Sequence, residues 1–417
     1  MTDFPLRRDR RARARRRSLL RAPLAITIVI AVLAVCYGGY ALLRPLPASA
    51  ATPSPALATP ALASAPLEWP ADGVAAIGEV GHSGVLASRG SQERTSIASM
   101  TKTVTALVVL DKKPLAKGES GPTYTFTAED QQIYENTVAE GGSRAPVVVG
   151  AQVTERQLLE GLMLPSGNNY AVTLANWAYG SMDEFLKAAR IWLDKHGLTD
   201  TVLADASGIN PGSQASPPNL VEIAKLVLAH PVLSTVVAEP TATIASLGDR
   251  GVLKNTNALL GTGGVIGLKT GTTIVAGACL MFAAEREIAG TKITVVGVVI
   301  GAPSHEALFA SVSKLLDSAY AGFTDTAVIK KGDPVGFIQT ASGSHANVVA
   351  AKDYSAVIWK DSAVTRDLKI DPLESGRQGD AAGTLTVTEN GTTTEIPLVL
   401  ADDLAGTSAW WRLVNPV

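Results

Sequence analysis

The chain has 417 residues, of which 46% are hydrophobic and 18% charged, so it can bury a sizeable core and is too long to be a single small module. Its formal net charge is −2, but residues 1–21 hold nine arginines against Asp3 and Asp9, a balance of +7, so the rest of the chain carries −9. This distribution argues against nucleic acid as a partner of the main body, because DNA and RNA binding need a basic surface.

Residues 22–43 contain no charged residue and would be roughly 33 Å long as a helix, enough to cross a bilayer core of about 30 Å. The arginines precede this segment, so the positive-inside rule predicts a single-pass protein of the cell membrane, with residues 1–21 as a cytoplasmic arm and the rest outside. The alternative is a signal peptide cleaved after the small-residue pattern Ala48-Ser49-Ala50, but the apolar core of a signal peptide is usually shorter. We therefore expect an uncleaved transmembrane anchor.

Residues 44–70 are rich in proline, alanine and serine, a composition that cannot form a packed core. We expect a semi-rigid linker between the membrane and the next domain. Beyond the apolar segment the only cysteine is Cys279, so the exported part can form no intramolecular disulfide. Its fold must be stabilised by its core alone.

The pattern of apolar residues predicts mixed helix and strand over residues 71–321. Two apolar runs, Val74–Val80 and Gly84–Ser88, predict a β-hairpin. Helical periodicity and capping patterns predict helices near residues 98–113, 154–164, 181–196 and 303–320, and another after Pro217-Pro218. Apolar and β-branched runs predict adjacent antiparallel strands at residues 265–270, 276–284 and 293–300. This order predicts an α/β domain of the α+β type, with helices packed on an antiparallel sheet.

After Gly322 short strand patterns dominate. Asn390-Gly391 separates the strand-like runs Thr384–Thr388 and Thr392–Leu398, which is typical of a tight hairpin. We expect residues 322–417 to form a small all-β C-terminal domain.

Three short motifs carry polar side chains suited to catalysis. Ser99-Met100-Thr101-Lys102 lies in a predicted helix, where residues three apart share one face, so Lys102 can act as a base toward Ser99. Ser166-Gly167-Asn168 lies in a loop between two predicted helices, and Lys269-Thr270-Gly271 lies on a predicted strand. The first pattern is weak alone, because chance gives about one match in this composition and Ser311–Lys314 is a second one. Only the combination of the three motifs is informative.

A serine nucleophile at position 99 needs a proton acceptor, and no well-placed histidine is visible in the sequence. Lys102 is the candidate, but its pKa must fall from about 10.4 to about 7 for the amine to be neutral at pH 7. Burial and a nearby cation have this effect, and Lys269 could be the cation. The five histidines are scattered and no His-Glu-x-x-His motif occurs, so a metallopeptidase is not expected, and we expect neither a metal nor a cofactor.

The three motifs occur in this order in penicillin-binding proteins and serine β-lactamases. With the strings around them, at residues 97–106, 161–169 and 255–277, the chain resembles the D-alanyl-D-alanine carboxypeptidase family of low-molecular-mass penicillin-binding proteins over residues 72–320. The spacing along the chain from Ser99 to Ser166, and from Ser166 to Lys269, also resembles that of the family. Residues after Gly322 resemble the C-terminal domain of the family more loosely.

The resemblance implies substrate contacts for the second and third motifs. Asn168 would hold the backbone amide of the substrate, and Lys269 with the hydroxyls of Thr270 and Thr272 would bind a terminal carboxylate. Gly271 would leave room for the substrate, which would pair with this strand. Backbone N–H groups at positions 99 and 272 would form an oxyanion hole.

The resemblance also implies the function. We expect a serine-type D-Ala-D-Ala carboxypeptidase that removes the terminal D-alanine from peptidoglycan stem pentapeptides through an acyl-enzyme on Ser99, with Lys102 as base and Ser166 as proton relay. The expected partners are stem peptides ending in D-Ala-D-Ala, β-lactam antibiotics and, through the N-terminal helix, the membrane. The alternatives are a D,D-endopeptidase, a β-lactamase, or a penicillin-sensing or wall-binding protein that is acylated without turnover. The Glu-x-x-Leu-Asn element of class A β-lactamases is absent, and the arginine-rich arm is too short for the output domain of a sensor.

Overall fold

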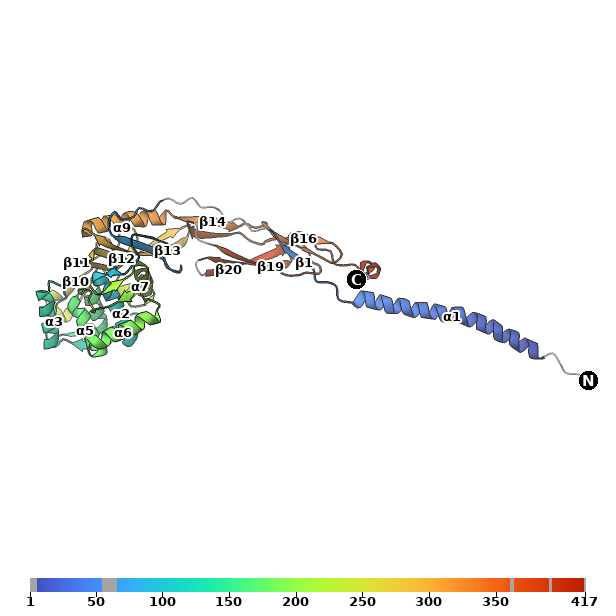
Figure 1. Cartoon of the computed structure of the whole chain (residues 1–417), viewed down its shortest axis with the longest axis horizontal. Coiled ribbons are helices and arrows are strands. Elements are labelled where there is room, and N and C mark those ends of the chain that lie inside the picture. Colours follow the sequence, from blue (N-terminus) through green and yellow to red (C-terminus); the bar gives the residue numbers. More distant parts are fainter. Residues whose placement is uncertain (1–5, 55–65, 361–363, 390–391, 416–417) are drawn as a thin grey trace, which may run out of the picture.

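The computed structural model describes residues 6–54, 66–360, 364–389 and 392–415. Figure 1 shows a globular unit of helices and strands at one end, an elongated β-rich unit beside it, and a long N-terminal helix at the other end.

A five-stranded antiparallel sheet forms the centre of the globular unit, in the order β11-β12-β13-β2-β3. The strands are Val265–Thr273 (β11), Gly277–Ile288 (β12), Thr291–Ala302 (β13), Val74–Glu79 (β2) and Ala87–Arg89 (β3). The predicted hairpin and the three predicted adjacent strands are both confirmed. Because β13 pairs with β2, the hairpin joins the same sheet as strands that come much later in the chain.

Both faces of this sheet are buried, because helices cover each of them. Alternate side chains point to opposite faces of a strand, so neighbours along β12 enter two different hydrophobic clusters. Cys279, Met281 and Ala283 pack toward the larger set of helices, and Leu280, Phe282 and Ala284 pack toward the last helix of the unit. Burial on both faces explains why these strands are almost continuously apolar in the sequence.

The larger set of helices covers one face of the five-stranded sheet and includes most of the predicted helices. It comprises the 3-10 turn Ala98–Met100 (η1) and the helices Thr101–Lys112 (α2), Ala128–Ala139 (α3), Glu155–Met163 (α4), Asn168–Tyr179 (α5), Met182–Lys195 (α6), Pro217–Ala229 (α7) and Leu233–Val236 (α8). The capping box predicted at Thr154 and Gln157 begins α4. The helix His305–Tyr320 (α9) covers the other face, as Figure 1 shows.

The C-terminal region is β-rich, as the sequence predicts. The strands Phe323–Ile329 (β14) and Tyr354–Trp359 (β17) form a pair. A separate six-stranded sheet includes Pro334–Gln339 (β15), His345–Ala350 (β16), Thr365–Ile370 (β18), Ala381–Glu389 (β19) and Thr392–Leu400 (β20). The predicted turn at Asn390-Gly391 lies outside the described residues, but β19 and β20 on either side of it are paired.

The expected linker over residues 44–70 needs a correction, because Ala50–Pro53 form a strand (β1) at the edge of the C-terminal sheet. The pairing with β15 is antiparallel and runs from Ala50 opposite Gln339 to Pro53 opposite Gly336. An edge strand needs only backbone N–H and C=O groups, so a short run of small residues suffices and a proline is tolerated. Composition therefore did not reveal the pairing.

The N-terminal helix Leu6–Leu43 (α1) joins the arginine-rich arm and the apolar segment in one element. Of the described helices, its part Pro23–Leu43 is the one long and apolar enough to cross a membrane. A short helix near the C-terminus, Ala409–Val414 (α10), contacts its end. Tyr37 Oη donates a hydrogen bond to the carbonyl of Leu413 at 2.6 Å, and Arg412 Nη1 donates to the carbonyl of Leu42 at 3.0 Å.

Candidate active site

Ser99 lies in η1, directly before α2, and faces the strand β11. A Cβ atom placed on Gly271 of β11 would lie 3.1 Å from both the backbone nitrogen of Ser99 and the Cβ of Ala98. Real Cβ atoms rarely come this close to a neighbour, so a larger residue at position 271 would need Ala98 or Ser99 to move by a few tenths of an ångström. The predicted role of Gly271 in leaving room for the substrate stays a prediction, because these contacts are with the protein's own backbone and Ala98.

Lys102 is fully buried one turn after Ser99 and has three polar neighbours. Its Nζ lies 2.8 Å from Ser99 Oγ, 2.6 Å from Asn168 Oδ1 and 2.8 Å from the carbonyl oxygen of Ser207. Asn168 Oδ1 and the carbonyl can only accept, whereas a hydroxyl can also donate. A neutral amine has two N–H donors and one lone pair. It fits this environment by donating to the two carbonyl oxygens and accepting the hydrogen of Ser99, and an ammonium fits it by donating to all three oxygens.

The electrostatics favour the same neutral form. Burial lowers the pKa of Lys102 well below its usual value, and the charge of Lys269 lowers it further, against an opposing effect of Asp205. Lys269 is itself 1% exposed, and burial lowers its pKa to about 7. Its Nζ donates to the carbonyl of Thr270 at 3.0 Å.

The loop around Asp205 supplies the carbonyl that Lys102 contacts. The Asp205 carboxylate accepts hydrogen bonds from Ser207 Oγ at 2.8 Å, from the Gly208 N–H at 2.7 Å and from Ser213 Oγ at 2.9 Å. These bonds fix the loop that presents the Ser207 carbonyl. The sequence predicts no role for these residues, because an Asp-x-Ser-Gly string indicates a turn and nothing in it indicates the distant lysine.

Ser166 lies in the loop between α4 and α5, two residues before Asn168. It is 4% exposed and has a φ of +63°, a conformation that a residue other than glycine rarely adopts. Such strain is concentrated at functional sites. Within the described residues its hydroxyl forms no hydrogen bond, whereas direct bonds join Ser99, Lys102 and Asn168.

The two threonines of the third motif have different partners. Thr270 Oγ1 lies 2.6 Å from Thr256 Oγ1. Thr272 Oγ1 lies 2.7 Å from the carbonyl of Gly271 and 2.7 Å from His305 Nε2. The carbonyl can only accept, so Thr272 donates to it and His305 Nε2–H donates to Thr272. His305, at the start of α9, was not found from the sequence because it belongs to a different element, far along the chain from its partner.

Ser99, Asn168 and Thr272 border a common cleft of about 420 Å³. Lys102 and Lys269 are buried and do not line it. Glu140 is the charged residue among the lining side chains, and the exposed side chains of Ile274 and Val275 form part of the rim. The cleft can therefore hold an extended peptide with its reactive carbonyl at the serine.

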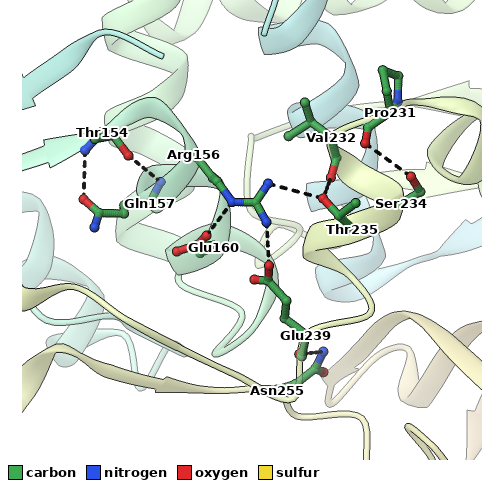
Figure 2. Close-up of polar contacts among 10 residues, drawn as sticks. All are labelled: Thr154, Arg156, Gln157, Glu160, Pro231, Val232, Ser234, Thr235, Glu239 and Asn255. Carbon is green, nitrogen blue, oxygen red and sulfur yellow. Dashed lines mark hydrogen bonds and ion pairs between the residues drawn. The ribbon is translucent and has the colours of Figure 1, made fainter. Parts of the chain in front are cut away.

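An ion-pair cluster holds α4, whose end leads into the loop of Ser166 (Figure 2). Arg156 Nε lies 3.0 Å from Glu160 Oε1, and Arg156 Nη2 lies 2.5 Å from Glu239 Oε1. Arg156 Nη1 also donates to Thr235 Oγ1 at 3.2 Å. Burial and the charge of Glu239 raise the pKa of Glu160 to about 7, although Arg156 opposes this.

We expect Arg156→Ala to destabilise the protein by about 2 to 3 kcal/mol, because it leaves the buried carboxylate of Glu160 without its cation and next to Glu239. In thermal unfolding this corresponds to a Tm lower by roughly 6 °C. Lys187→Ala is the matched control, because it removes an ion pair with Glu184 whose side chains are both more than half exposed. Equal Tm values for the two variants would contradict the prediction.

Comparison with known proteins shows the family to which the chain belongs. The family model described as D-alanyl-D-alanine carboxypeptidase matches residues 65–304. A D-alanyl-D-alanine carboxypeptidase of Streptomyces sp. strain K15 is 34% identical over 252 residues, which cover 57% of this chain and 82% of the relative. D-alanyl-D-alanine carboxypeptidase DacF of Bacillus subtilis is 25% identical over 334 residues, which cover 77% of this chain and 82% of the relative.

Solved structures give a similar result. The crystal structure of the Streptomyces K15 DD-transpeptidase superposes with a TM-score of 0.54 at 29% identity and covers 62% of this chain and 100% of that one. Penicillin-binding protein 5 of Haemophilus influenzae superposes with a TM-score of 0.57 over 83% of this chain and 100% of that one. At 20% identity, this second likeness shows a shared fold.

Proposed function

Because the chain belongs to the D-alanyl-D-alanine carboxypeptidase family, we propose that it is a serine-type enzyme that removes the terminal D-alanine from peptidoglycan stem pentapeptides. The observation that carries the proposal is the environment of Lys102, which fits a neutral amine hydrogen-bonded to Ser99. A buried, neutral lysine beside a serine is the base that acyl transfer needs in a site without a histidine at the serine.

In the first step Ser99 Oγ attacks the carbonyl of the penultimate D-alanine, and Lys102 takes the hydroxyl proton. The C–N bond then breaks, and the departing nitrogen of the terminal D-alanine receives a proton through Ser166. Water attacks the resulting ester, which releases the shortened peptide and restores the serine. Backbone N–H groups at positions 99 and 272 would stabilise the oxyanion in both steps, with a contribution of a few kcal/mol per donor.

Of the two polar atoms in the Asn168 side chain, one is left to bind the substrate. Its Oδ1 already accepts from Lys102, so Nδ2 is the group available to a peptide. As a donor, this Nδ2 would bind a carbonyl of the substrate backbone. Asn168 thus connects the base to the bound peptide.

We assign the terminal carboxylate of the substrate to Lys269 and the hydroxyls of Thr270 and Thr272. A carboxylate needs a cation and hydrogen-bond donors, and these three residues lie within four consecutive positions of β11. Thr272 would turn its hydroxyl hydrogen from the carbonyl of Gly271 to the carboxylate, and Lys269 would act from behind the cleft wall. This assignment explains a preference for a C-terminal residue.

The assignment predicts a pH dependence. Burial lowers the pKa of Lys269 to about 7, so the ammonium loses its charge as the pH rises through 7. We expect the ratio of kcat/KM for a D-Ala-D-Ala peptide to kcat/KM for the same peptide with a C-terminal amide to fall above pH 7, by up to tenfold per pH unit. Taking the ratio cancels the titration of Lys102. A ratio that is constant from pH 6 to 9 would contradict the carboxylate assignment.

The proposed test of the activity is release of free D-alanine from diacetyl-Lys-D-Ala-D-Ala by the full chain in detergent. Fluorescent penicillin, which should acylate the same serine, is used in parallel, and the labelled peptide is identified by mass spectrometry. Release together with a label on Ser99 supports the proposal. Labelling without release would favour a D,D-endopeptidase or a penicillin sensor, and absence of both would overturn it.

We also propose that the enzyme is anchored in the cell membrane and faces outward. The helix Pro23–Leu43 would anchor it in the cell membrane, with the arginine-rich residues in the cytoplasm and residues 71–321 and 322–417 outside as catalytic and β-rich domains. Protease treatment of intact and permeabilised cells tests this orientation. Digestion of the catalytic domain only after permeabilisation of the membrane would overturn it.

A further inference from the structure

Thr256 touches two separate parts of the candidate active site. It follows the short strand Val252–Lys254 (β10) and donates its N–H to the carbonyl of Leu164 at 3.1 Å. Its Oγ1 lies 2.6 Å from Thr270 Oγ1. Leu164 is two residues before Ser166, and Thr270 is one of the residues to which we assign the substrate carboxylate. One side chain outside the three motifs therefore reaches the hydroxyl of a motif residue.

The segment that carries Thr256 is fixed to the body of the enzyme, as Figure 2 shows for its neighbour Asn255. Asn255 Nδ2 donates to the carbonyls of Glu239 at 3.0 Å and Val237 at 3.3 Å, and the Asn255 N–H donates to the carbonyl of Pro240 at 2.9 Å. The side chain of Glu239 is held by Arg156 of α4. Two sets of contacts thus fix the backbone that carries the Thr256 hydroxyl. One is the bond from the Thr256 N–H to Leu164, and the other is the set of bonds from Asn255 to the segment that Arg156 of α4 holds.

The hydrogens of the two hydroxyls can be counted. Each threonine has one O–H hydrogen. Thr256 can give its hydrogen to Thr270 Oγ1 at 2.6 Å or to the carbonyl of Leu164 at 3.4 Å, and the second distance is too long for a good O–H···O bond. When Thr256 donates to Thr270, the hydrogen of Thr270 remains available to an anion.

We propose, on the basis of the carboxypeptidase function proposed above, that Thr256 is a positioning residue that orients the Thr270 hydroxyl so that it donates to the terminal carboxylate of the substrate. Thr256 itself does not touch the reacting atoms. It acts on binding of the carboxylate and not on the attack by Ser99.

The test compares Thr256→Val, which removes only the hydroxyl, with Thr256→Ser, which keeps it, in the full chain in detergent. Thr256 is exposed, so neither change disturbs the core. We expect Thr256→Val to raise KM for diacetyl-Lys-D-Ala-D-Ala about five- to tenfold, the scale of one lost hydrogen bond. The kcat for this peptide and the kcat/KM for its C-terminal amide should change by less than twofold. Thr256→Ser should restore KM to within twofold of the wild-type value.

Thr262→Val is the matched control, because Thr262 is an exposed threonine of the following turn. The concentration of active enzyme is measured by titration with fluorescent penicillin, since partial unfolding lowers the apparent kcat and leaves KM unchanged. An unchanged KM in Thr256→Val, an equal loss on the amide, or failure of Thr256→Ser to restore KM would each overturn the inference. If the wild-type enzyme is active and Thr256→Val has an unchanged KM, the inference about Thr256 fails and the proposed function stands. If the wild-type enzyme is inactive, the proposed function fails as well.

Discussion

Ser99→Ala should abolish release of D-alanine and covalent labelling by penicillin together, with a loss in kcat of roughly 10⁴-fold or more. The reason is that, among the described hydroxyl-bearing residues that line the cleft, Ser99 is the one hydrogen-bonded to Lys102, the proposed base. The folded state should be unaffected, because the change removes one oxygen from a partly buried side chain. D-Alanine release, gel fluorescence and Tm are measured on the same preparation.

The chain offers an internal control for this variant. Ser311 begins the second Ser-x-x-Lys match, on α9, where its hydroxyl donates to the carbonyl of Leu308 at 2.8 Å. Ser311→Ala should leave both labelling and release at wild-type levels. Loss of activity in Ser311→Ala, or labelling retained in Ser99→Ala, would show that the nucleophile is misassigned.

Lys102→Arg should lower the rate of acylation by about three orders of magnitude, because it places a permanent cation where a neutral amine is needed as the base. A guanidinium stays protonated at all accessible pH values, so it cannot accept the proton of Ser99. In the wild-type enzyme burial and Lys269 lower the pKa of Lys102 well below its usual value, which increases the fraction of neutral base at neutral pH. On the acidic side, acylation should slow as Lys102 becomes protonated.

The measurement is the second-order rate constant of penicillin acylation between pH 5 and 9. The wild-type rate should rise with pH and then level off, and the rate of Lys102→Arg should be low throughout. Lys314→Arg, at the exposed lysine of the second Ser-x-x-Lys match, is the control and should follow the wild-type profile. A wild-type profile in Lys102→Arg would exclude Lys102 as the base.

Local patterns were enough to predict the elements that carry the motifs. The three-residue spacing of Ser99 and Lys102 depends only on helix geometry, and the capping box at Thr154 depends on four consecutive residues. Both features are short-range, and the structure confirms them. The three adjacent apolar strands were predictable for a similar reason, because burial on both faces makes them apolar along their whole length.

Contacts between distant residues could not be predicted in this way. The carbonyl of Ser207 that completes the environment of Lys102 comes from a loop far along the chain, and His305 and Thr272 lie on different elements. A backbone carbonyl carries no sequence pattern at all. The edge strand Ala50–Pro53 was missed because its partner β15 lies in the C-terminal region and the contact uses main-chain atoms.

The pairing of β1 with β15 has a mechanical consequence for an enzyme that works on a polymer under tension. In Figure 1 the C-terminal sheet lies between the N-terminal helix and the globular unit that carries β11 and α2. Ladder hydrogen bonds run across the strands, so a pull along β1 loads all of them in shear at once and does not open them one by one. The β-rich unit would then keep its length when β1 is pulled. In the proposed orientation it would set the height above the bilayer at which stem peptides can be trimmed.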